Sequence, residues 1–164
     1  MASLNSTKNL TPVTRASREE RHSRQTASAY MQCLVVAPTA ARRQMIHDAA
    51  QTEAWDAMVC SNSTEFLRCV FRQKVALIVI DLPRAESGEY RQIRNAAEDA
   101  VRLSDALLLV SGAGASADEE IWARSLGVWS YLPHADCEEG FQHVLRAAQD
   151  AIGRREQLQP APPP

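Results

Sequence analysis

The chain has 164 residues, of which 45% are apolar and 23% are charged. These values predict one soluble globular domain, and no run of roughly eighteen apolar residues predicts a membrane span. The net charge is −2, but residues 1–30 carry five basic and two acidic residues, which leaves −5 for the rest of the chain. A weakly acidic body does not favour nucleic-acid binding, and the polar start lacks the apolar core of a secretory signal. We expect a cytoplasmic protein that binds neither nucleic acid nor membrane.

Composition divides the chain into three parts. Residues 1–29 are rich in Ser, Thr, Arg and Asn, so they cannot bury enough apolar surface to offset chain entropy, and we predict a disordered arm. Residues 156–164 form a proline-rich tail that we also predict to be disordered. The predicted folded domain is therefore 30–155.

Within that domain, short apolar segments alternate with segments of helical period. Continuous Val, Ile and Leu runs are typical of strands that are covered on both faces. In chain order we predict a strand at 33–37, a helix at 40–54, a strand at 57–60, a helix at 63–73, a strand at 76–80, a helix at 88–104, a strand at 106–110, a helix from 116 to 127, a strand at 128–132 and a helix from 136. The fourth helix shows a capping-box spacing of Ser116 and Glu119 and a closing Gly127.

Five strand–helix units predict an α/β protein with a doubly wound, five-stranded parallel sheet. In such sheets the functional crevice lies at the carboxyl ends of the strands. The most informative residue there is Asp81, because it follows the buried run of the third strand.

The loop after the fourth strand contains Gly112 and Gly114 and fits the spacing G-x-G-x-x-A, which in other proteins cradles a dinucleotide phosphate. A dinucleotide-binding fold normally places this motif after its first strand, and here a single strand follows. We therefore keep a small nucleotide-binding protein as an alternative, and a flexible loop ahead of a helix as the simpler interpretation.

The five units resemble the receiver domain of two-component response regulators, over about residues 33–153. By this resemblance Asp81 matches the phospho-accepting aspartate, Ser111 the hydroxyl that contacts the phosphoryl group, and Tyr131 the aromatic residue that moves on activation. The run GVWSYLPHA at 127–135 looks like the G-A-x-x-Y-L-x-K-P run of the family. The resemblance implies a flavodoxin-like topology with strand order 2-1-3-4-5.

The chain departs from the receiver pattern where the chemistry matters. Receivers end the first strand in two acids that hold Mg²⁺, whereas this chain has Ala37 and Pro38, and His134 replaces the lysine of the family. The loop from Asp81 to Gly88 is also one residue shorter than the usual spacing. Phosphoryl transfer requires charge neutralisation, which Mg²⁺ largely supplies through carboxylate ligands, and a histidine is mostly neutral at pH 7.

We therefore predict a non-catalytic pseudo-receiver that acts by protein–protein contact, needs no cofactor and is not an enzyme. Its expected partners are a histidine kinase, an output protein or a second copy of itself. The alternative is a single-domain response regulator that is phosphorylated on Asp81 with weak Mg²⁺ binding. A further hypothesis pairs Asp81 with His134 in a pH-sensitive contact.

Aromatic side chains near the fourth helix and fifth strand are candidates for the interaction face, namely Trp122, Trp129 and Tyr131. Core filling is the alternative for them. The four cysteines lack metal-type spacing, and we expect small buried hydrophobic side chains in a reducing compartment.

Overall fold

Five parallel strands form one sheet in the order β2-β1-β3-β4-β5, which confirms the predicted fold class. The computed structural model describes residues 31–112, 114, 116–133 and 135–158. The predicted arm lies outside these residues. The strands are β1 (Gln32–Val36), β2 (Asp56–Cys60), β3 (Leu77–Asp81), β4 (Leu107–Gly112) and β5 (Ser130–Pro133).

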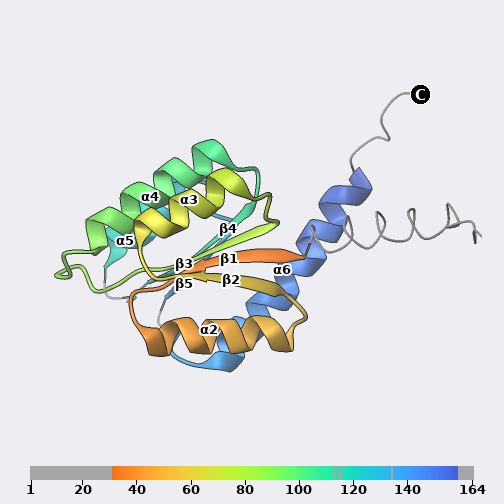
Figure 1. Ribbon diagram of the computed structural model, residues 1–164, viewed down its shortest axis with the longest axis horizontal. Coiled ribbons are helices and arrows are strands. Elements are labelled where there is room, and N and C mark those ends of the chain that lie inside the picture. The colour runs from red at the N-terminus through yellow and green to blue at the C-terminus, as the bar shows by residue number, and fades with distance from the viewer. Residues whose placement is uncertain (1–30, 113, 115, 134, 159–164) are drawn as a thin grey trace, which may run out of the picture.

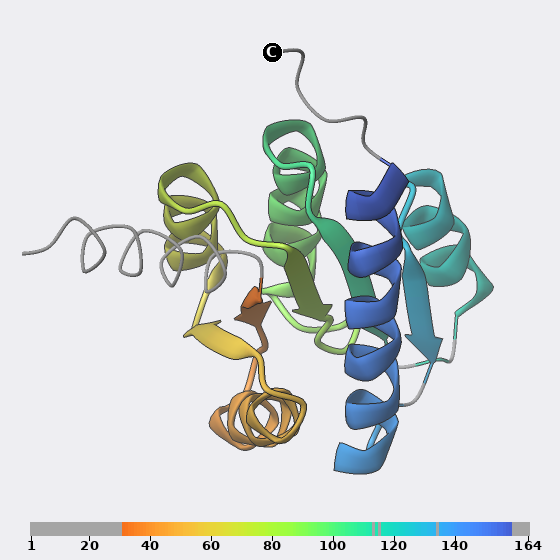
Figure 2. The same ribbon diagram turned by 90° about the vertical axis from the view of Figure 1, so that its right-hand side faces the viewer.

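Helices cover both faces of the sheet, as Figure 1 shows. The helices α3, α4 and α5 lie on one face, and α2 and α6 lie on the other. Their bounds are α2 (Ala40–Thr52), α3 (Ser63–Arg72), α4 (Tyr90–Leu103), α5 (Ala117–Ser125) and α6 (Glu138–Leu158). Figure 2 shows α6, in blue, as the longest of them. It continues past residue 155, where the sequence predicted the domain to end.

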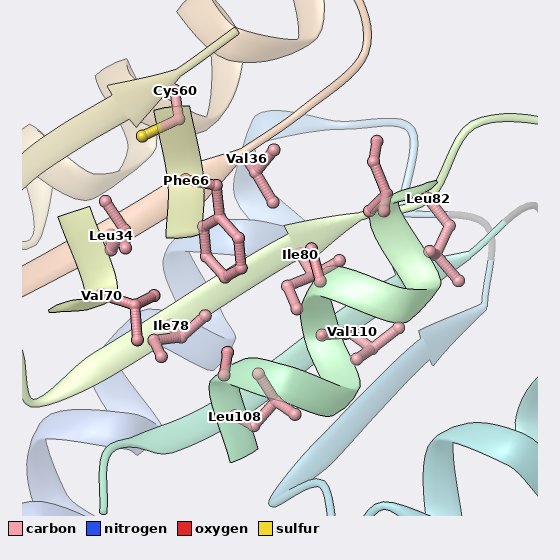
Figure 3. Packing of buried hydrophobic residues seen from close by; sticks show 14 of the residues in the cluster. Leu34, Val36, Cys60, Phe66, Val70, Ile78, Ile80, Leu82, Leu108 and Val110 are labelled. Carbon is pink, nitrogen blue, oxygen red and sulfur yellow. The ribbon is translucent and has the colours of Figure 1, made fainter. Parts of the chain in front are cut away.

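The sheet separates two apolar clusters, since successive side chains of a strand point to opposite faces. One cluster packs Phe66 of α3 and Ile93 of α4 against alternate strand residues, and Figure 3 shows part of it. The other packs Ile46 of α2 and Phe141 of α6 against the opposite face. Burying each such side chain contributes about 1.5–3 kcal/mol to folding. These clusters hold the carboxyl ends of the strands in a fixed arrangement.

Polar contacts join α6 to the residues that follow α2. The indole Nε1 of Trp55 donates to the carbonyl of Leu145 over 3.2 Å. The Arg146 guanidinium donates to both carboxylate oxygens of Glu53, at 2.9 and 2.7 Å. Glu53 is 9% exposed, and its charge is compensated by Arg146, whose side chain is largely exposed at the rim of the α2–α6 contact. Among the described residues, no helix combines the length and apolar character needed to cross a bilayer.

Helix α5 begins and ends where the sequence predicted, but its capping box does not form. Ser116 is the N-cap residue and makes no side-chain capping hydrogen bond. The predicted partner, Glu119, turns inward instead, and its buried carboxylate accepts hydrogen bonds from two tyrosine hydroxyls. Gly127 follows the helix with φ of 75°, a backbone conformation that favours glycine.

Candidate functional site

Asp81 is the last residue of β3 and lies beside Ser111 in the register of β3 and β4. Its position in the middle of the sheet places it at the crevice beyond the carboxyl ends of the strands. The residue is 3% exposed. A carboxylate buried to this degree needs a partner for its charge.

The partner is Arg42, in the first turn of α2. Its Nε donates to Asp81 Oδ2 over 2.9 Å and its Nη2 donates to Oδ1 over 2.6 Å, so the pair is bidentate. The side chain of Arg42 is 24% exposed, against 5% for that of Asp81. The hydrogen bond to Asp81 is the main reason why the pKa of Arg42 is raised. The contact is a charge-assisted pair largely shielded from solvent.

Further contacts hold the guanidinium in place. Its Nη1 donates to the carbonyl of Ala135 over 2.7 Å, and its Nη2 lies 3.5 Å from the Ser111 hydroxyl oxygen. The guanidinium carbon lies 5.5 Å from the centre of the Phe141 ring, within range of a cation–π contact. Arg42 therefore bridges α2, β3 and the segment after β5. We call Arg42, Asp81, Ser111 and Ala135 the Arg42 site.

The residues around Asp81 do not fit a Mg²⁺ ion. Ala37 and Pro38 offer no carboxylate, and their carbonyl oxygens accept hydrogen bonds from Arg43 Nη1 at 2.9 and 3.2 Å. Both oxygens of Asp81 are engaged by Arg42. Within the described part of the chain, no group of three or more His, Cys, Asp or Glu side chains is arranged to hold a metal ion. Mg²⁺ requires several oxygen ligands in near-octahedral geometry, which this set does not offer.

Arg42 is not among the site residues predicted from the sequence, because partners for Asp81 were expected only at the ends of strands. Parallel strands direct the first turns of the following helices to the same edge of the sheet, so an arginine two residues into α2 was a usable signal. The sequence predicted no cation beside Asp81, and the structure places the Arg42 guanidinium there. His134 lies outside the described residues, and the hypothesis of an Asp81–His134 contact stays a prediction.

A second polar cluster lies beside the first, around the buried carboxylate of Glu119. Tyr131 donates to Glu119 Oε1 over 2.8 Å, and Tyr90 donates to Oε2 over 3.1 Å. Glu119 is 4% exposed. Gly112 is tightly covered, because a Cβ atom there would lie 1.7 Å from Glu119 Oε1 and 2.6 Å from the Tyr131 hydroxyl. We call Tyr90, Gly112, Glu119 and Tyr131 the Glu119 cluster.

The Glu119 cluster disfavours the alternative in which the Gly112 and Gly114 loop binds a nucleotide. Of the predicted loop, Gly112 ends β4 and Gly114 has φ of 68°, while positions 113 and 115 lie outside the described residues. A phosphate-binding loop must let a phosphate approach its glycine backbone. Here the Glu119 carboxylate occupies that space at Gly112 and would repel an anion.

The three aromatic residues proposed for an interaction face lie in different surroundings. Trp122 is 8% exposed, donates to Glu98 Oε1 over 3.0 Å and lies under the guanidinium of Arg94, 4.3 Å from the ring centre. Tyr131 packs against the same cluster of α3, α4 and α5, whereas Trp129 packs against the α2–α6 cluster on the other face. The structure therefore does not gather the three side chains into one patch.

The Glu119 cluster predicts a pH dependence of stability at high pH. Burial, followed by the hydrogen bond to Glu119, raises the pKa of Tyr131 above its ordinary value of about 10. The native state therefore keeps the phenol proton that the unfolded state loses. The contribution of Tyr131 to stability is fully present below pH about 10 and is lost as the pH rises through the folded-state pKa.

Urea unfolding of the wild type and Tyr131→Phe at a series of pH values from about 8 to 11 checks this expectation. The stability of the wild type should fall more steeply above pH about 10 than that of the variant. The variant should keep part of the slope, because burial and Glu119 also raise the pKa of Tyr90. Parallel curves for the two proteins would contradict the assignment.

Known structures share this arrangement of strands and helices. A receiver domain protein (CheY-like) from Methanospirillum hungatei JF-1 matches with a TM-score of 0.65 and 13% identity, over 79% of this chain and 99% of that one. A response regulator receiver domain protein from Clostridium thermocellum matches with a TM-score of 0.62 and 18% identity, over 78% of this chain and 98% of that one. The chain has the fold of receiver domains.

A response regulator from Burkholderia pseudomallei, whose structure contains a phosphorylated aspartic acid, a calcium ion and citrate, also matches. Its TM-score is 0.59 and its identity is 18%, over 79% of this chain and 75% of that one. No protein-family model matches the sequence, and neither does any of the curated proteins. At these identities the similarity establishes the fold and leaves function to the side chains of the site.

Proposed function

We propose that the protein is a receiver-like signalling module that acts by protein–protein contact. We further propose that Asp81 is held in an ion pair with Arg42 and is not phosphorylated. The bidentate pair is the observation that carries the proposal. The receiver fold supports the signalling class, since structures with this fold include response regulators. We propose that the module is not an enzyme.

An aspartate that accepts a phosphoryl group needs a free oxygen for attack. Both oxygens of Asp81 accept hydrogen bonds from Arg42, so one lone pair on each oxygen is occupied and the carboxylate charge is partly neutralised. If the ion pair broke, the free carboxylate would be buried without a charged partner, which is costly. Arg42 thus lowers the reactivity of Asp81 in the ground state, independently of the poor set of Mg²⁺ ligands.

Action through protein contact is supported by the exposed apolar side chains on the α4–α5 side of the domain. Ile121 of α5 is 64% exposed, and Leu103 at the end of α4 is 45% exposed. Such side chains can contribute contact area to a partner. The partner we propose is a histidine kinase, an output protein or a second copy of the chain, and the proposed compartment is the cytoplasm.

Incubation with acetyl phosphate and Mg²⁺, followed by intact-mass measurement in acid, tests the proposal. We expect the wild type to gain no phosphoryl group under conditions in which a competent receiver domain is fully labelled. Because a missing label alone could reflect rapid hydrolysis, beryllofluoride with Mg²⁺ is the second arm, and we expect no change in the intrinsic tryptophan fluorescence.

Incorporation of one phosphoryl group in the wild type that is lost in Asp81→Asn would overturn the proposal in favour of the phosphorylated response regulator. A beryllofluoride response that is lost in Asp81→Asn would do the same. Arg42→Gln gives a further comparison, because it removes the cation while keeping a polar side chain. We expect this variant to remain unlabelled too, since Ala37 and Pro38 still offer no carboxylate.

A further inference from the structure

Two cysteine side chains lie in contact where the end of β2 meets α3. The Cys60 thiol donates a hydrogen bond to the sulfur of Cys69, with 3.8 Å between the two sulfur atoms. Cys60 ends β2 and is 1% exposed, whereas Cys69 in α3 is partly exposed. Figure 3 shows Cys60 at the border of the apolar cluster. Neither residue belongs to the Arg42 site or to the Glu119 cluster.

The segment between the two cysteines is held at several points. Asn62 Oδ1 accepts the backbone N–H of Glu65 over 2.9 Å and so caps α3. Glu65 Oε2 in turn accepts the backbone N–H and the hydroxyl of Ser61, at 2.7 and 2.8 Å. The next residue, Phe66, is fully buried in the cluster. The contacts of Ser61 with Glu65, the Asn62 cap of α3 and the burial of Phe66 therefore hold the two sulfurs near each other without a covalent bond.

We propose that Cys60 and Cys69 form a modification site at which a hydroperoxide oxidises the two thiols to an intramolecular disulfide. The Cys69 sulfur attacks the outer oxygen of the hydroperoxide, the O–O bond breaks, and the departing alkoxide takes the thiol proton to give an alcohol. The Cys60 sulfur then displaces hydroxide from the Cys69 sulfenic acid. The S–S bond forms, and the Cys60 proton leaves with the hydroxide as water. Two thiols are oxidised and one peroxide is reduced.

The surroundings of the two sulfurs assign these roles. Cys69 is the partly exposed residue of the pair and Cys60 is buried, so we assign the first reaction with the peroxide to Cys69. Cys60 lies behind it and already points its S–H group at the Cys69 sulfur. Burial raises the pKa of the Cys60 thiol, so its thiolate is scarce and Cys60 is not the sulfur that reacts first with the peroxide.

Closing the bond requires a small displacement. A disulfide has a sulfur–sulfur distance of about 2.05 Å, so the two atoms must approach by somewhat less than 2 Å. Strand β2 is at the edge of the sheet, and α3 covers it from one side. We expect side-chain rotation and a slight shift of α3 to supply this movement.

Peptide mapping of the intact chain tests the proposal. The protein is treated with hydrogen peroxide, free thiols are blocked with N-ethylmaleimide, and the product is digested with trypsin without reduction. Cleavage after Arg68 places Cys60 in peptide 44–68 and Cys69 in peptide 69–72, so the disulfide would join two separate peptides. We expect this linked pair, lighter than the sum of its parts by two hydrogen atoms, and its loss on reduction.

Variants separate the pair from the other thiols. Cys69→Ser should abolish the linkage and leave Cys60 free to react with maleimide after denaturation. Cys33→Ser and Cys137→Ser should keep the linkage, because Cys33 lies buried in β1 and Cys137 is exposed elsewhere. Recovery of both thiols in alkylated form, over-oxidation of Cys69 without linkage, or a disulfide to Cys33 or Cys137 would each overturn the proposal. Because wild-type peptides are read directly, the test does not depend on the folding of a variant.

Discussion

Arg42→Ala is expected to lower the free energy of unfolding by about 3–5 kcal/mol, the range for removal of one partner of a buried ion pair. Asp81 is 3% exposed, and the described hydrogen bonds to its carboxylate from a charged group both come from Arg42. The change therefore removes the charged partner of a buried carboxylate. It also frees the carbonyl of Ala135 and removes the contact of the guanidinium with the Phe141 ring. Urea denaturation followed by circular dichroism measures the loss.

A matched control is Arg91→Ala, at an exposed position of α4, which should change stability by no more than about 0.5 kcal/mol. A double-mutant cycle then tests whether the cost arises from the pair. Arg42→Met combined with Asp81→Leu removes both charges while keeping side-chain volume, so it should cost much less than the sum of the two single changes. Additive losses would show that the two residues contribute independently and would contradict the assigned ion pair.

Gly112→Ala is expected to destabilise the protein by about 3 kcal/mol, the upper part of the range for overpacking. The added methyl group would lie 1.7 Å from Glu119 Oε1, so the carboxylate must leave its position. It would then lose the hydroxyl groups of Tyr90 and Tyr131. The cost is therefore both steric and electrostatic, because a displaced buried carboxylate is poorly solvated.

Truncation of Glu119 tests whether the cost of Gly112→Ala arises from displacing its carboxylate. Glu119→Ala opens the space, so Gly112→Ala should cost much less in that background, with a coupling energy of about 1 kcal/mol or more between the two positions. Gly153→Ala in α6 is the control, because nothing lies within 4 Å of a Cβ there and alanine favours a helix. It should stabilise the protein slightly. An equal cost of Gly112→Ala with and without Glu119 would contradict the packing that we describe.

The fold could be predicted because the segment pattern is regular. The central strands read as continuous apolar runs, and buried strands of a parallel sheet require this composition on both faces. Asp81 could be singled out for the same reason, as an acid at the end of such a run. The predicted strand bounds differ from the structure by a residue or two, and β5 begins at Ser130.

The contacts of the site were harder to predict, because they join residues far apart in the chain. Arg42 and Asp81 are separated by 39 positions, and Arg42 and Ala135 by 93. No local spacing links them, so only the assembled sheet brings them together. Glu119 was difficult to place for a related reason. Its spacing from Ser116 predicted a local capping box, whereas the tyrosines that donate to it come from α4 and β5.

The Arg42 site also has a consequence for how signalling output depends on the amount of the protein. A phosphorylated domain depends on a donor whose supply varies, whereas both charges of this pair are encoded in one polypeptide and are always present in equal number. Dilution cannot separate them, and depletion of high-energy phosphate cannot remove the cation. Under the function that we propose, output would therefore follow the number of molecules synthesised and degraded, so transcription and proteolysis would be its controls.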